Sequence, residues 1–248
     1  MKVLSTMPEI PTIEILGTKI STLNMEETLD VLDQYAAGSE PHLIVTADST
    51  ALVIANQKPA FQEILNKASF ITADSVGIMW AMRRKGIANP NKVSGVDMVD
   101  HLCRLSAERG YRLYFIGSEP GVTELAAERF RLKYPGVNIV GTQHGYFDAD
   151  SDEIIAQAIA ETQPDFLFVA MGMPRQEEFI LKTQNIIRAK VAMGVGGSFD
   201  VYSGKTRRAP KFVQKLHLEW FWRLMLNPSK FSKVRSLPIF VGMILRSK

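Results

Sequence analysis

The chain has 248 residues, of which 46% are hydrophobic and 22% charged, a composition typical of a water-soluble globular protein. Its single cysteine, Cys103, excludes an intrachain disulfide and a cysteine-based zinc site. No run reaches the roughly 18 consecutive apolar residues of a membrane-spanning helix, and the N-terminus lacks the apolar run of a signal peptide. We therefore expect a cytoplasmic protein.

The formal net charge of +3 conceals a strong asymmetry. Residues 204–248 contain 11 Lys or Arg and one acid, Glu219, whereas residues 1–203 carry 18 bases and 25 acids. Basic and aromatic residues alternate in the tail, as they do in helices that lie on membrane surfaces. We predict an α/β core over residues 1–203 and a helical, basic, amphipathic appendage over 204–248 that meets a membrane rather than nucleic acid; the alternative is a solvated helix face.

Over the first 200 residues, short apolar runs alternate with longer amphipathic ones, the pattern of βα units on a parallel sheet. Asn24 and Glu27 have the spacing of a capping box, and Gly38 ends the helix that they begin. The predicted strands are 42–47, 70–73, 111–116, 137–140, 166–170 and 190–193. The predicted helices are 25–37, 49–56 with Ser49 as its cap, a piece after Pro59, 76–85, 96–109, 122–133, 152–161, 176–187 and 210–226.

Strands this apolar are normally covered on both faces, so we predict a Rossmann-like, mostly parallel central sheet with helices on both sides. Ligands of such sheets bind outside the carboxyl ends of the strands. Two of these ends carry the tripeptide Thr-Ala-Asp, which finishes at Asp48 and at Asp74. Each carboxylate could cap the following helix or act as a general base, and the spacing does not choose between the two.

Two later segments offer places for an anionic ligand. The turn before the helix at 176–187 places Arg175 and Gln176 in its first turn, where unpaired N–H groups suit a phosphate, while Glu177 and Glu178 suit the helix dipole. The loop at Gly194, Gly196 and Gly197 lets the backbone approach a ligand closely, and the turn at Gly117 is similar. Neither loop matches a P-loop or G-x-G-x-x-G, so each alone is a weak nucleotide signal.

A metal site finds little support in the sequence. Asp148 and Asp150 form a D-x-D, but they lie in a polar stretch before a helix and are better explained as solvated capping carboxylates. The four histidines show no ligand spacing.

Ten short motifs follow one another along the chain. They are Val45-Thr-Ala, Ala73-Asp-Ser-Val-Gly-Ile, Val93-Ser-Gly-Val-Asp, Phe115-Ile-Gly-Ser, Gly141-Thr-Gln-His-Gly-Tyr-Phe, Pro164-Asp, Gly172-Met-Pro-Arg-Gln-Glu, Gly194-Val-Gly-Gly-Ser-Phe-Asp, Arg208-Ala-Pro and Leu218-Glu-Trp-Phe-Trp-Arg-Leu. In their order and spacing the chain resembles the WecG/TagA/CpsF glycosyltransferases (glycosyltransferase family 26) from about residue 13 to 228.

The resemblance implies an inverting transfer of a sugar, N-acetylmannosamine or a related hexose or uronic acid, from a UDP-sugar to a polyprenyl-diphosphate-linked sugar. It implies a metal-independent enzyme that is peripheral at the inner face of the cell membrane, and it is compatible with a homo-oligomer. The family's base falls on Asp74, and its pocket threonine and glutamine fall on Thr46 and Gln176. Its tail arginines fall on Arg208 and Arg223.

We add Arg207 to these arginines, and we expect the remaining substrate contacts at Asp48, Lys92, Gly117, Arg175, Gly194, Gly196 and Gly197. The chain departs from the family pattern at Asp48 (usually Asn), Ser75 (usually Gly) and Lys92 (usually Arg). Lys92 keeps the charge but loses the bidentate geometry of arginine. We further expect the basic tail to fold over the ligand edge of the sheet on membrane binding. The alternative function is an NAD(P)-dependent Rossmann oxidoreductase acting on nucleotide-sugars.

Overall fold

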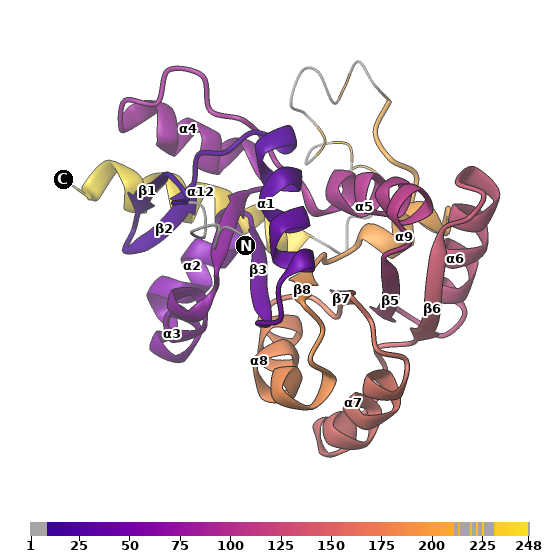
Figure 1. Cartoon of the computed structure of the whole chain (residues 1–248). Helices are drawn as coiled ribbons and strands as arrows, with labels where there is room; N and C mark the ends of the chain where they lie inside the picture. The colour runs from indigo at the N-terminus through magenta and orange to yellow at the C-terminus, as the bar shows by residue number, and fades with distance from the viewer. Residues whose placement is uncertain are drawn as a thin grey trace, which may run out of the picture.

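The computed structural model describes residues 9–210, 213, 219, 222, 225 and 231–247. A six-stranded sheet with the order β4-β3-β8-β7-β5-β6 crosses the molecule, and every neighbouring pair of its strands is parallel (Figure 1). The strands are β3 (His42–Ala47), β4 (Phe70–Ala73), β5 (Arg112–Gly117), β6 (Asn138–Gln143), β7 (Phe166–Ala170) and β8 (Val191–Gly194). The predicted Rossmann-like parallel sheet is therefore confirmed.

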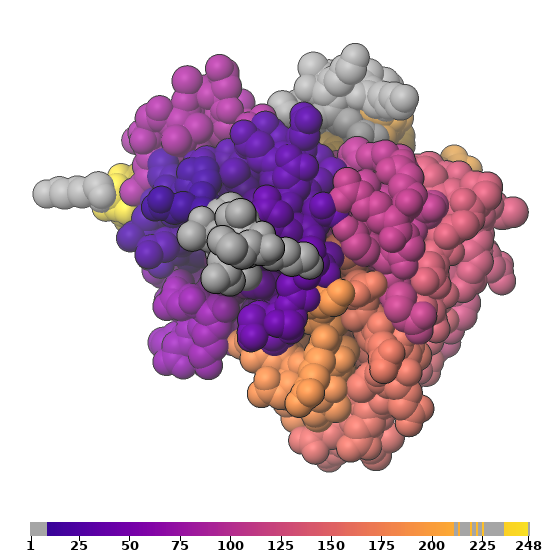
Figure 2. Space-filling view, in the orientation of Figure 1, coloured from indigo at the N-terminus to yellow at the C-terminus, as the bar shows by residue number. Residues whose placement is uncertain are grey.

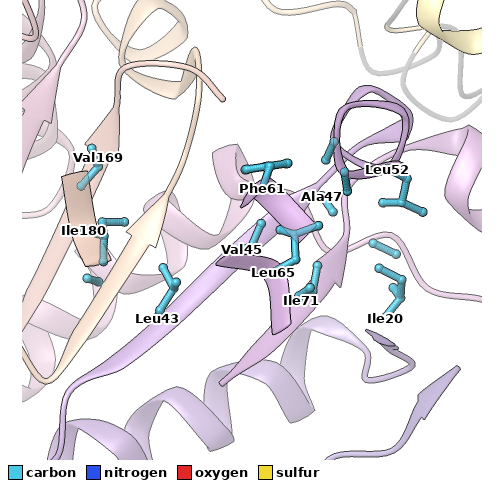
Figure 3. Packing of buried hydrophobic residues seen from close by; sticks show 14 of the residues in the cluster. Ile20, Leu43, Val45, Ala47, Leu52, Phe61, Leu65, Ile71, Val169 and Ile180 are labelled. Atoms are coloured by element: carbon cyan, nitrogen blue, oxygen red, sulfur yellow. The ribbon is translucent and has the colours of Figure 1, made fainter. Parts of the chain in front are cut away.

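Helices cover both faces of the sheet, because successive strand residues point to opposite sides. Leu43 and Val45 face one core, shown in Figure 3 with Phe61 and Leu65, whereas Ile44 faces the other. The first core is covered by α2 (Ser49–Gln57), α3 (Pro59–Lys67), α4 (Val76–Arg84), α7 (Asp152–Glu161) and α8 (Arg175–Ile187). The second is covered by α1 (Met25–Ala37), α5 (Gly95–Arg109), α6 (Val122–Lys133) and α9 (Ser198–Tyr202), with α1 and α5 side by side in Figure 2.

Most helices and strands have bounds close to those predicted from the sequence. The capping box is present, since the Asn24 side chain accepts from the Glu27 N–H and the Glu27 side chain accepts from the Asn24 N–H. One cap differs from the prediction. Helix α2 is capped by Asp48, whose Oδ1 accepts from the N–H groups of Thr50 and Ala51 at 2.8 and 3.0 Å, and not by Ser49.

A β-hairpin of two short strands and a 3₁₀ turn were not predicted. Strands β1 (Thr12–Ile15) and β2 (Thr18–Ser21) form an antiparallel hairpin, and the turn residues Leu16 and Gly17 both have positive φ, as a tight two-residue hairpin turn requires. The hairpin buries Ile15 and Ile20 completely in the first core. A single 3₁₀ turn at Ala149–Ser151 precedes α7.

The helix α12 (Phe231–Arg246) changes the interpretation of the tail. Its Phe240 is fully buried and Ile244 nearly so, both in the first core, and Figure 1 shows the helix beside α2 and α4. The hydroxyls of Ser236 and Thr50 are 2.8 Å apart. The last part of residues 204–248 is therefore integrated into the core and is not an appendage.

The predicted helix 210–226 falls largely outside the described residues, although 213, 219, 222 and 225 are helical. Among the helices that the structure describes, none has the length and apolar character needed to span a bilayer.

Candidate active site

The two Thr-Ala-Asp segments end neighbouring strands. In β3 and β4, Thr46 lies opposite Thr72 and Ala47 opposite Ala73, so Asp48 and Asp74 both follow the carboxyl edge of the sheet. The Asp74 N–H donates to the carbonyl of Ala47 at 2.9 Å, which extends the pairing by one residue. The two carboxylates therefore emerge at the same edge, as expected for a ligand site of a parallel sheet.

The structure separates the two carboxylates that the spacing left equivalent. Asp48 caps its own helix α2. Asp74 does not cap the helix that follows it, because the Ser75 hydroxyl performs that task for α4. Instead, Asp74 Oδ2 accepts from the N–H of Gly95, the first residue of α5, at 3.1 Å. The positive end of a helix dipole suits a carboxylate held in this place.

Thr46 ties the end of β3 to the end of β8. It is 6% exposed, and its hydroxyl donates to the carbonyl of Gly194 at 2.8 Å. A Cβ on Gly95 would lie 3.3 Å from Thr46 Oγ1 and 3.4 Å from the Cα of Val195, so only glycine fits comfortably here. The structure therefore brings together Thr46, Asp74 and Gly194, three of the predicted site residues.

Gln176 connects two loops at the same edge. Its side chain is buried, and its Oε1 accepts from the N–H groups of Gly172 and Gly196, each at 3.2 Å. Its Nε2 donates to Glu177 Oε1 at 2.7 Å. The amide of this predicted pocket residue is thus occupied by protein groups, and it joins the turn before α8 to the glycine loop after β8.

The glycines predicted to contact the substrate differ in what a side chain at each position would meet. A Cβ on Gly194 would overlap with Gln176 Nε2 and lie 2.8 Å from Glu177 Oε1, and a Cβ on Gly117, which has a positive φ, would overlap with the backbone of Ala170. By contrast, Gly196 has open space where a Cβ would be, and at Gly197 the nearest atom would be 3.7 Å away. Close packing of the protein therefore explains Gly117 and Gly194, while it does not explain Gly196 and Gly197.

Glu177 is a buried acid that sequence reasoning assigned only to the helix dipole. Its side chain is fully buried, and among the described residues no group hydrogen-bonds to its Oε2. Burial raises the pKa of the carboxyl to about 7, outweighing the hydrogen bond from Gln176, with further increases from Glu178 and Asp48. Nothing in the local sequence distinguishes Glu177 from the exposed Glu178.

Two predicted cations meet beside α5. Arg208 Nη2 donates to Asp97 Oδ1 at 2.6 Å, and Glu219 lies between Arg208 and Lys92, pairing with both. Burial would raise the pKa of Asp97, but hydrogen bonds from Ser94 and Arg208 outweigh it and lower the pKa. Because Asp97 lies in the same first turn as Gly95, these cations adjoin the helix end that holds Asp74.

The other predicted basic residues lie elsewhere. Arg207 is exposed, and Arg223 falls outside the described residues. Arg175 forms its ion pair with the buried Asp152 of α7, and not with the carboxylates at the strand ends. Its guanidinium also lies over the rings of Phe147 and Phe179. Among the residues that the structure describes, no three His, Cys, Asp or Glu side chains gather as a metal site would need, and metal independence stays a prediction.

Comparison with known proteins gives a match that includes the motifs named above. Residues 13–248 match the glycosyl transferase WecG/TagA/CpsF family. The chain belongs to this family. It is 30% identical over 238 residues to proteins of Staphylococcus aureus strains MRSA252 and NCTC 8325 that are named N-acetylglucosaminyldiphosphoundecaprenol N-acetyl-β-D-mannosaminyltransferase, covering 95% of this chain and 93% of each relative.

The resemblance stated from the sequence is thereby confirmed, and the protein is a glycosyltransferase. The alternative, an NAD(P)-dependent oxidoreductase, is not supported by these matches.

Proposed function

We propose that this glycosyltransferase moves N-acetylmannosamine or a closely related sugar from a UDP-sugar to a polyprenyl-diphosphate-linked sugar. The relatives' names specify an N-acetyl-β-D-mannosaminyl group and an undecaprenyl-diphosphate-linked N-acetylglucosamine. The observation that carries the proposal is the position of Asp74, fixed by the Gly95 N–H at the strand edge beside Thr46 and the glycine loop.

In the proposed reaction, the Asp74 carboxylate takes the proton of the attacking acceptor hydroxyl. The hydroxyl oxygen bonds to the anomeric carbon of the donor while the bond from that carbon to the UDP oxygen breaks, which inverts the configuration. A general base must lie within hydrogen-bond reach of the proton that it removes, and the hydrogen bond from the Gly95 N–H to Oδ2 helps to fix the position of the Asp74 carboxylate.

UDP leaves with additional negative charge, which fixed cations and N–H groups can stabilise. Lys92 and Arg208 supply two such cations next to the N-terminus of α5. Both cations are paired with carboxylates of Glu219 or Asp97, and a diphosphate would compete with these carboxylates for them. Arg207 is exposed on the same segment. We expect no metal to be required.

The basic segment from Gly204 onward supports association with an anionic membrane surface, where a polyprenyl-linked acceptor resides. Eleven cations and one acid give this segment the charge that anionic lipids attract. We therefore place the enzyme at the inner face of the cell membrane as a peripheral protein, with the lipid-linked acceptor and the UDP-sugar as its partners.

A donor screen against a short-chain lipid-diphosphate-linked N-acetylglucosamine tests the proposal. We expect UDP release with one N-acetylated hexose donor, and a loss of kcat of about 10²- to 10⁴-fold in Asp74→Asn, the range that general bases contribute. Asn retains an oxygen for the Gly95 N–H, so the fold should persist. Asp48→Asn, the matched control, restores the residue usual in the family and should change kcat less than about tenfold.

Two results would contradict the proposal. If no donor gave UDP release, the assigned substrates would be wrong. If the Asp74→Asn variant were as active as the wild type, Asp74 would not be the general base.

A further inference from the structure

We propose that Glu177 is a positioning residue of the transferase site: its carboxylate fixes the orientation of the Gln176 amide, which in turn holds the turn at Gly172 and the glycine loop at Gly196 together. This inference rests on the proposed function, because sugar transfer is its readout. It assigns a task to a buried acid that the mechanism above does not use.

The contacts form one connected chain. Glu177 Oε1 accepts from Gln176 Nε2 at 2.7 Å, which leaves Gln176 Oε1 facing the N–H groups of Gly172 and Gly196. Both side chains fill the space beside Gly194. The carbonyl of Gly194 in turn accepts from Thr46, so the position of Gln176 is linked to the strand edge that carries the base.

The ionised carboxyl enforces this orientation because a carboxylate has only acceptor atoms. It must face the NH₂ group of Gln176, and the amide oxygen then necessarily points at the two loop N–H groups. A protonated carboxyl also donates, so it accommodates the flipped amide. The flip would place NH₂ against two N–H donors and lose both loop hydrogen bonds, each worth about 1 kcal/mol.

Protonation of Glu177 is therefore expected to loosen the two loops. Burial raises the pKa of this carboxyl to about 7, and the charged groups that act on it, Glu178 of its own helix and Asp48 at the end of β3, raise it further. A group with such a pKa is about one-tenth ionised at pH 6 and about nine-tenths ionised at pH 8. The fraction of molecules in which a carboxylate enforces the observed amide orientation should change in proportion.

The experiment measures kcat/KM for the UDP-sugar between pH 5.5 and 8.5. We expect a wild-type rise between pH 6 and 8 with its midpoint near 7, and about tenfold, the change in the ionised fraction, is its upper limit. Glu177→Gln keeps an oxygen for Gln176 Nε2 but cannot ionise, so its profile should lack this rise. Glu178→Gln is the matched control, since it removes the adjacent, exposed acid, and it should keep the rise.

A rise that persists unchanged in Glu177→Gln, or that is missing from the wild type, overturns the inference while leaving the proposed function intact. Absence of transfer by the wild type overturns the proposed function itself, so the two failures are distinguishable. If Glu177→Gln does not fold, Glu177→Asp replaces it. That variant keeps the carboxyl but shortens its reach, so we expect the rise with a lower plateau; an unchanged plateau would overturn the inference.

Discussion

The buried carboxyl of Glu177 should make the stability of the protein depend on pH in an unusual direction. Burial raises its pKa from 4.5 to about 7, so the folded state binds this proton more tightly than the unfolded state does. The stabilising contribution is fully present below pH 4.5 and is lost as the pH rises to about 7. Paired acids with lowered pKa values behave in the opposite way.

The size of the effect follows from the two pKa values. Each pKa unit is worth about 1.4 kcal/mol, so the separation between 4.5 and about 7 amounts to about 3.5 kcal/mol. About 2.5 kcal/mol of this loss falls between pH 5 and pH 8. With a urea dependence of about 2.5 kcal/mol per molar, the corresponding shift of the unfolding midpoint is about 1 M.

The assay is urea unfolding of the wild type and Glu177→Gln at both pH values. Other titrating groups contribute equally to the two proteins, so the difference between their free energies of unfolding isolates Glu177. We expect this difference to change by about 2.5 kcal/mol in favour of the variant between pH 5 and pH 8. Glu178→Gln should show no such change, because its side chain is exposed. A wild-type-to-Glu177→Gln difference that is constant with pH would refute the reasoning.

Two further substitution pairs test the packing around the site. Gly194→Ala should displace Gln176 and lower the free energy of unfolding, measured by urea titration, by about 1–3 kcal/mol. Gly197→Ala should unfold like the wild type. Equal effects of the two substitutions would contradict the contacts assigned to Gly194. Phe240→Ala should lower that free energy by about 3–5 kcal/mol because it empties a fully buried site, and Ile239→Ala, 47% exposed, should cost much less. If the Phe240→Ala variant were as stable as Ile239→Ala, α12 would not be packed into the core as described.

The sheet and most helices were predictable because their signals are local. Helix α6 has the predicted bounds, from residue 122 to residue 133. Helix α5 ends at Gly110, which adopts the left-handed conformation that glycine favours. The hairpin was missed because its strands have four residues each and its turn begins with Leu16, a residue that seldom takes a positive φ.

The tail was predicted less well because its partners are distant in sequence. Basic composition suggested a boundary near residue 204, but composition alone cannot show which apolar faces of α2 and α4 are still uncovered. Phe240 and Ile244 cover part of them. A deletion of residues 204–248 would consequently remove core side chains along with the cations, so loss of activity in such a truncation would not show that the tail acts as a lid.

The choice between Asp48 and Asp74 shows the same limit within the site. Both end the tripeptide Thr-Ala-Asp, and any purely local pattern treats them alike. They differ through a contact 21 residues further along, the Gly95 N–H, and through Ser75, which takes over the cap of α4. The family resemblance points to Asp74 as the base, which stays a prediction; the structure shows that Asp48 is engaged as the cap of α2 and Asp74 with the N-terminus of α5.

The glycine loop carries the same argument to the ligand. In the sequence its three glycines look equivalent, and all were predicted to approach a substrate. The Gln176 and Glu177 side chains fill the space where a Cβ on Gly194 would lie, whereas a Cβ would meet open space at Gly196 and an ordinary contact with Asp200 at Gly197. Under the proposed function, a donor that approaches this backbone would meet Gly196, whose N–H donates to the Gln176 amide oxygen. The orientation of that buried amide would then set the position of the Gly196 backbone, and Glu177 would act on the reaction through Gln176.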